Sequence, residues 1–128
     1  MNAPPHDPAR AHKFRQAAFV YLHVAILYEA SAYAMWRHGL LPASRGPVWV
    51  WLVLGAVVAG AIFLGLLRWQ NVWFARAIWV IHSMRLPALI GSAFISTVET
   101  GLSRAFYITA IVVVTINLWM LARAGWDV

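Results

Sequence analysis

Residues 71–100 read NVWFARAIWV IHSMRLPALI GSAFISTVET, an apolar stretch that carries three basic side chains, Arg76, His82 and Arg85. The stretch exceeds the roughly 20 apolar residues that a helix needs to cross a bilayer. Ionisable groups are costly inside a membrane helix, so they usually face protein or water. The segment therefore predicts a transmembrane helix with one polar side.

Spacings of three and four residues place most of the polar groups of this stretch on one helical face. The predicted face comprises Asn71, Ala75, Ile78, His82, Arg85, Leu89, Ser92, Ser96 and Glu99. Pro87 cannot donate a backbone hydrogen bond to the carbonyl of Ser83 and clashes with it, so we expect a kink in this segment.

The composition of the whole chain fits the same environment. Its 128 residues are 62% hydrophobic and 11% charged, whereas a soluble domain is about 25% charged. The formal net charge is +6, but the basic residues cluster at the ends of apolar segments, which indicates lipid contact rather than nucleic-acid binding. The chain has no cysteine, which excludes disulfides, thiolate metal sites and covalently attached haem.

Four apolar segments, at about 17–36, 47–67, 72–98 and 104–122, are long enough to span a bilayer. They predict an all-α fold, a polytopic four-transmembrane-helix bundle occupying residues 17–123. A basic, proline-rich tail (1–16) precedes this membrane domain, and a short tail (124–128) follows it. Asp7 and Pro8 are favourable residues for a helix start, so the first helix is expected to begin in the tail.

The basic residues that flank the segments also predict an orientation. One side holds Arg10, Lys13, Arg15, Arg68, Arg76 and Arg123, and the other holds Arg37, Arg45 and Arg104. This asymmetry predicts that both termini are cytoplasmic, in a bacterial-type inner membrane. Arg10, Lys13 and Arg15 are predicted to form a lipid-facing basic anchor for anionic headgroups. A cleaved signal peptide is the alternative for the first segment, but Glu29 and His23 interrupt its pattern, so we expect retention.

The second segment carries small residues at a spacing of four, Gly55 with Ala59 and Ala56 with Gly60. Such spacings let two helix backbones approach closely. We expect this face to pack within the bundle, and a homo-oligomer contact is the alternative.

The first and third segments each bring an ionisable group to a similar depth. Glu29 follows Gln16 by 13 residues and Arg85 follows Asn71 by 14, so both lie about 20 Å into their helices. An unpaired charge there costs about 2.5–3.5 kcal/mol. We therefore predict an intramembrane charge cluster of Glu29, His82 and Arg85, in which Glu29 and Arg85 form an ion pair. The pair is expected to be a static clamp, and a switchable proton or cation site is the alternative.

Two histidines leave one cofactor hypothesis open. His23 and His82, on neighbouring parallel helices, could be axial ligands of haem b, although hydrogen bonding of each ring within the bundle is the simpler expectation. The sequence contains no glycine-rich phosphate loop, no HExxH and no carboxylate cluster. We therefore expect a protein without enzymatic activity, metal or cofactor. Binding of haem b and a lipid-modifying activity built on His82 and Glu29 are the alternatives.

The run Tyr21-Leu22, Ala25-Ile26-Leu27 and Glu29 resembles the first helix of the small multidrug resistance transporters, which also have four helices. The resemblance implies a dual-topology homodimer in which Glu29 couples protons to cation export. It covers about nine residues, and the third-helix pattern of that family, GxAYAxWxG, has no counterpart in residues 72–98. We therefore assign the chain to no family on this basis.

Two functions are consistent with these features. The first is a non-catalytic small membrane subunit that packs against other subunits, or against copies of itself, in a larger complex. The second is a small oligomeric proton-coupled transporter or channel that uses Glu29, His82 and Arg85.

Overall fold

The computed structural model describes residues 7–39, 47–95 and 104–127. These ranges form helices and no strand: α1 (Pro8–Arg37), α2 (Val48–Trp69), α3 (Val72–Ser83), α4 (Arg85–Ile90), the short π-helix η2 (Gly91–Ile95) and α5 (Arg104–Trp126). Within them, four stretches are long and apolar enough to cross a membrane, namely α1, α2, residues 72–94 and α5. The predicted all-α architecture with four membrane-spanning helices is therefore confirmed.

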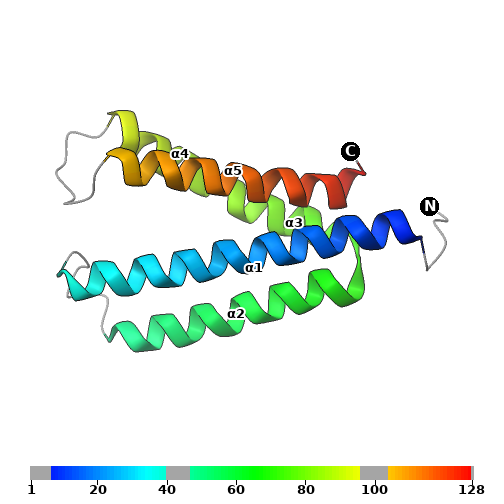
Figure 1. Cartoon of the computed structure of the whole chain (residues 1–128), viewed down its shortest axis with the longest axis horizontal. Helices are drawn as coiled ribbons and strands as arrows, with labels where there is room; N and C mark the ends of the chain where they lie inside the picture. Colours follow the sequence, from blue (N-terminus) through cyan, green and yellow to red (C-terminus); the bar gives the residue numbers. More distant parts are fainter. Residues whose placement is uncertain (1–6, 40–46, 96–103, 128) are drawn as a thin grey trace.

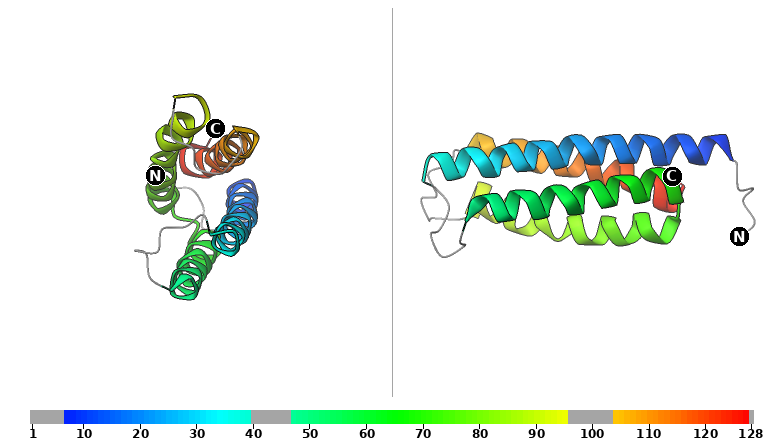
Figure 2. Two further views of the ribbon diagram at one scale, coloured as in Figure 1. Left: turned by 90° about the vertical axis from the view of Figure 1, so that its left-hand side faces the viewer. Right: turned by 90° about the horizontal axis from the view of Figure 1, so that it is seen from below.

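The helices lie side by side in the order α2, α1, α5, α3. Helix α1 packs against α2 on one side and α5 on the other, and α3 packs mainly against α5 (Figure 1). Seen end-on, the four helices form an arc with α2 and α3 as its outer members (Figure 2). The start of α1 and the end of α5 lie at the same end of the bundle (Figure 1), which we call the terminal end.

Local sequence accounts for the helix boundaries. Asp7 Oδ1 accepts a hydrogen bond from the backbone N–H of Ala9 at 3.1 Å, and Pro8 follows as the first helical residue. Helix α1 therefore begins where the sequence predicts, inside the N-terminal tail. Between α2 and α3, Gln70 adopts a left-handed conformation, and Asn71 Oδ1 accepts from the N–H of Trp73 at 2.9 Å to cap α3.

The third span is interrupted as the sequence predicts. Helix α3 ends at Ser83, and Met84 separates it from α4, which contains Pro87. The break lies next to Ser83, the residue whose carbonyl Pro87 cannot engage. The interruption at Met84 lies where Pro87 predicts a kink.

The polar face predicted for residues 71–99 runs across this break. Ala75, Ile78 and His82 are buried, whereas Arg85 is exposed. His82 and Arg85 nevertheless contact the same side of α1, because their ring partners there are seven residues, or about two turns, apart. Ser96 and Glu99 lie outside the described residues.

The tightest packing lies near the terminal end. Its buried residues come from α1, α2, α3 and α5, and each lies within a few turns of that end. They are Phe14, Ala17, Ala18, Tyr21, Leu66, Ala75, Ile78, Leu121 and Ala124. The rest of the bundle is held by smaller contacts, and many of its large apolar side chains face outward, as a bilayer would allow.

Candidate functional site

Side-chain hydrogen bonds join the helices at the terminal end. Lys13 Nζ lies 2.6 Å from Asp127 Oδ1, and Arg123 Nη1 donates to Gln16 Oε1 at 2.9 Å, which ties α1 to the end of α5. The Lys13 hydrogen bond and charge hold the pKa of the exposed Asp127 carboxyl below its usual value. Arg10 donates to the carbonyl of Gln70, so α1 also contacts the end of α2.

These contacts change the interpretation of the basic anchor. Arg10 and Lys13 are half-buried and engage other helices, and only Arg15 of the three predicted anchor residues is exposed. Contact of the three residues with anionic lipid therefore stays a prediction, and Arg10 and Lys13 also link parts of the bundle. Each finds an acceptor on the chain, the Gln70 carbonyl and the Asp127 carboxylate.

Arg76 belongs to the same end of the bundle. Its Nε donates to the carbonyl of Gly125 at 2.9 Å, and its guanidinium lies over the rings of Trp73, at 4.7 Å, and Trp126, at 5.3 Å. A side chain on Gly125 would crowd this arrangement, because a Cβ there would lie 3.1 Å from Arg76 Cγ. Arg76 therefore joins α3 to α5.

His82 is buried in the middle of the bundle. Its ring lies 5.2 Å from the ring of Tyr21, centroid to centroid, and only 8% of the residue is exposed. Neither His82 Nε2 nor the buried Oδ1 of Asn117 has a hydrogen-bond partner in the described part of the chain. The middle of the bundle thus holds polar atoms in an otherwise apolar environment.

His23 lies elsewhere on α1. It is exposed, and its Nδ1 lies 2.7 Å from the carbonyl oxygen of Phe19. Tyr21, the α1 residue whose ring contacts His82, lies two residues before His23 and therefore about 200° away around the helix. The structure therefore does not bring His23 and His82 together as an axial pair.

Arg85, at the start of α4, lies against α1. Its guanidinium carbon is 4.6 Å from the centroid of the Tyr28 ring, and both residues are exposed. A cation over an aromatic face is attractive, particularly where water is scarce. Because Tyr28 precedes Glu29, the contact also places Arg85 at the depth of Glu29, as the sequence predicts.

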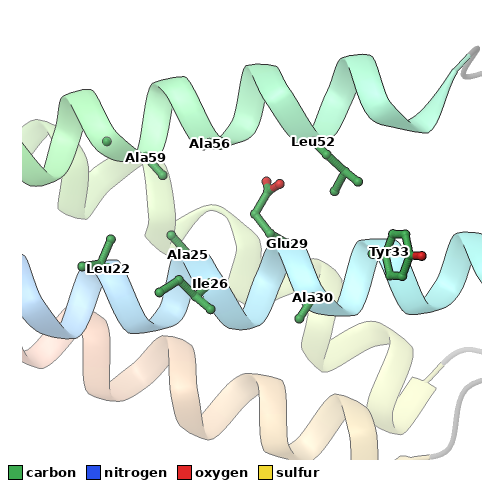
Figure 3. Close-up of a pocket in the computed structure, with 10 residues that line it drawn as sticks. Leu22, Ala25, Ile26, Glu29, Ala30, Tyr33, Leu52, Ala56 and Ala59 are labelled. Atoms are coloured by element: carbon green, nitrogen blue, oxygen red, sulfur yellow. The ribbon is translucent and has the colours of Figure 1, made fainter.

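Glu29 projects to a different side of α1. Figure 3 shows its carboxylate directed toward α2, where a methyl group on Gly55 would collide with Glu29 Oε1. This carboxylate lies in a groove of about 500 Å³ between α1 and α2, which we call the Glu29 groove. The lining is otherwise almost entirely apolar and comprises Leu22, Ala25, Ile26, Ala30, Tyr33, Leu52, Ala56, Ala59 and Gly60.

The predicted ion pair between Glu29 and Arg85 is not formed. In residues 7–39, 47–95 and 104–127, the only carboxylate and basic nitrogen within 4.0 Å belong to Asp127 and Lys13. Tyr28 and Glu29 differ by about 100° around α1. Arg85, which lies over the Tyr28 ring, and Glu29, which faces α2, are therefore on different sides of this helix. The predicted cluster is therefore divided between two sides of α1. His82 and Arg85 lie on the side of Tyr21 and Tyr28, and Glu29 lies on the side that faces α2.

The small residues of α2 are used within the chain. Gly55 is next to Glu29, and Ala56, Ala59 and Gly60 line the groove against α1. Small side chains on this face let α1 and α2 approach closely. The expected packing within the bundle is found at Gly55, which lies close to Glu29, and at Ala59, which packs against the core. Ala56 is exposed and a Cβ on Gly60 would meet nothing within 4 Å, so this part of the face borders the open groove.

Sequence reasoning overlooked two buried groups, Tyr21 and Asn117. Asn117 is 1% exposed, and it is the only amide side chain of the apolar α5 stretch. An isolated amide in a membrane helix is a signal for an inward-facing position. The acceptors of Arg76 and Lys13, which are the Gly125 carbonyl and the Asp127 carboxylate, gave no such signal. Their positions depend on where α5 ends and how the chain leaves it.

Comparison of this chain with family models, with curated proteins and with solved structures finds no match. The functional argument therefore rests on the geometry of the chain itself.

Proposed function

We propose that this protein is a non-catalytic accessory subunit, without metal or cofactor, that packs laterally within a larger membrane protein complex. One observation carries the proposal: Arg85 is exposed about 21 Å along its span, and no acidic group lies within ion-pair distance of it among the described residues. Acyl chains cannot neutralise an arginine, so a protein surface is the natural cover for it.

The remaining surface fits this role. Large apolar side chains cover the outside of α2 and α5, including Trp49, Val57 and Trp119. In this proposal both termini face the cytoplasm of a bacterial-type inner membrane, because six basic residues flank that side against three on the other. Exposed Arg15 and Arg68 then lie among anionic headgroups.

The test is the size and composition of the assembly that contains the protein. The full chain, tagged at its C-terminus, is extracted from native membranes in a gentle detergent and separated by native electrophoresis. We expect co-migration with other membrane proteins at a fixed stoichiometry, and loss of this co-migration in Arg85→Gln. Arg37→Gln, which alters another exposed arginine, is the matched control. Migration without any other protein would contradict the accessory role.

The Glu29 groove supports a second candidate, a small oligomeric proton-coupled transporter or channel. A half-buried carboxylate in an open apolar groove can bind a proton or an organic cation. In proteoliposomes, Glu29→Gln should then abolish proton-driven uptake of a lipophilic cation such as tetraphenylphosphonium, with folding intact. Equal uptake by the wild type, Glu29→Gln and protein-free vesicles would contradict transport of this cation.

A further inference from the structure

Two opposite charges lie at one depth of the bundle without meeting. Arg85 rests on Tyr28, and Glu29 is the next residue of α1 but faces α2. Gly55, beside Glu29, lies seven residues inside α2, or about 10 Å from its end, so this depth belongs to the apolar span. Each unpaired charge at the centre of a span costs about 2.5–3.5 kcal/mol on insertion scales.

The directions of the two groups argue against a contact within one copy. The two positions on α1 differ by about 100°, and the Glu29 carboxylate lies between α1 and α2, beside Gly55. Arg85 lies on the Tyr28 side of α1 and is exposed there. One copy therefore offers an acid on one side and a base on another, which is the arrangement of a self-complementary surface.

We propose that copies of this chain associate around an axis along the membrane normal, so that Arg85 of one copy enters the Glu29 groove of the next. A rotation about this axis keeps every residue at its depth, and the equal depth of Glu29 and Arg85 is what such an assembly requires. The groove is open and almost entirely apolar, so its single carboxylate selects a cationic occupant.

The pairing would remove both unpaired charges at once. The guanidinium can donate two hydrogen bonds to the carboxylate, while its flat face remains on Tyr28. Arg85 then has two functions, packing against its own α1 and binding the acid of its neighbour. This inference deepens the proposed accessory role, because it names the chain itself as one partner, and it rests on the same exposed Arg85.

Reciprocal charge changes test the pairing between copies. Glu29→Arg and Arg85→Glu are made in separate, differently tagged full-length chains, expressed alone and together. Each variant alone has like charges at every contact, so its dissociation concentration should rise about a hundredfold or more over wild type. In mixed oligomers the introduced arginine of one chain meets the introduced glutamate of the other, and the native Glu29 and Arg85 that remain also pair. Mass photometry in nanodiscs or gentle detergent would measure the recovery.

Recovery of mixed oligomers supports the inference, because an ion pair within one chain cannot be restored by another chain. Mixed copies that remain as dissociated as either variant alone would overturn it. Should a variant fold poorly alone, the yield of folded protein on co-expression gives the same comparison. Glu99, outside the described residues, is the rival acid, and dissociation by Glu99→Gln but not by Glu29→Gln would also overturn the inference.

Cross-linking gives an independent measurement, since the chain has no cysteine of its own. Copies carrying Glu29→Cys are mixed with copies carrying Arg85→Cys and treated with a short thiol-to-thiol linker. We expect cross-links between differently tagged copies, and none when Arg37→Cys replaces Arg85→Cys. Equal cross-linking in both mixtures, or none in either, contradicts the arrangement.

The outcomes separate this inference from the proposed function. Homo-oligomers that contain no other protein would support the pairing and contradict the accessory role. Single copies bound to other proteins would support the accessory role and overturn the pairing. Single copies without any partner would contradict both.

Discussion

At the terminal end, α1, α2 and α5 are joined by side-chain hydrogen bonds above a buried core, whereas farther along Glu29 and Arg85 have no charged partner among the described residues. Both regions come from the same helices and the same apolar composition. The difference is the availability of acceptors. At the terminal end, the chain supplies the Gln70 carbonyl, the Gly125 carbonyl and the Asp127 carboxylate.

From this comparison we expect the contacts of the terminal end to determine the stability of one copy, and the middle of the bundle to take part in contacts with other molecules. Buried charges that meet their acceptors within a chain contribute to its own folding. Charges that remain unpaired are weak contributors to folding and strong candidates for contacts between chains. Paired substitutions, one in each region, can test this division.

Truncation of a buried leucine should have the largest effect. Leu121 is fully buried in the core, and Leu54 is 51% exposed on α2. We expect Leu121→Ala to lower the free energy of unfolding by about 2 kcal/mol or more, because a cavity replaces its packing contacts. Leu54→Ala should change it by less than about 0.5 kcal/mol. Denaturation in mixed micelles with increasing SDS measures both, and equal losses would contradict the division.

Removal of Arg76 should have the next largest effect. Arg76→Ala loses the hydrogen bond to Gly125 and the contacts with Trp73 and Trp126, so we expect a loss of about 1–3 kcal/mol. The matched control is Arg68→Ala, an exposed arginine of the same end, which should cost less than about 0.5 kcal/mol. The same denaturation measurement applies. Comparable losses of unfolding free energy in the two variants would show that positive charge at this end, rather than the contacts of Arg76, determines the stability.

Two glycine-to-alanine changes compare the regions on a single helix. At Gly65 a Cβ would lie 2.7 Å from Phe74 Cε1, a ring atom within the packed end. At Gly55 it would meet only the Glu29 carboxylate, which is the end of a flexible side chain. We expect Gly65→Ala to destabilise by about 1–2 kcal/mol and Gly55→Ala to be neutral or slightly stabilising, since alanine favours helix. Thermal unfolding followed by circular dichroism distinguishes them.

The smallest expected effect concerns pH at the exposed Lys13–Asp127 pair. Because the folded-state pKa of Asp127 is lowered from 3.8, the folded state binds this proton less tightly than the unfolded state. Its small stabilisation is thus complete well above pH 3.8 and is lost as the pH falls through the lowered pKa. Carbon-13 NMR of the Asp127 carboxyl should report a midpoint below 3.8 in wild type and a higher one in Lys13→Gln. Identical midpoints would contradict the pairing.

Local chemistry made much of the fold predictable. Asp7 and Pro8 predict the start of α1, Pro87 predicts the break after Ser83, and the small residues of α2 predict its contact with α1. Each of these features acts within one helix or on its immediate neighbour. The length and composition of the apolar segments predict the four spanning helices, but not the order in which they pack.

The sequence predicts how deep the residues of the candidate site lie in the bundle, but not the side of the helix toward which each of them points. Counting residues along the helices places Glu29 and Arg85 at one depth, and the contact of Arg85 with Tyr28 agrees with it. Arg85 contacts the Tyr28 side of α1 whereas Glu29 faces α2, and counting residues along single helices does not specify how the helices are rotated about their axes. The acceptors of Arg76 and Arg10 are backbone carbonyls of distant segments, which side-chain identity does not reveal.

The two hydrogen bonds between α1 and the end of α5 join residues 107 and 114 positions apart. During synthesis the chain emerges from its N-terminus, so α1 and α2 can pair in the membrane long before Arg123 and Asp127 exist. The Glu29 groove, which α1 and α2 form between them, can therefore assemble early, while the terminal end closes last. If copies pair as proposed, the groove that receives Arg85 of a neighbour is thus formed before the terminal end of its own chain is closed.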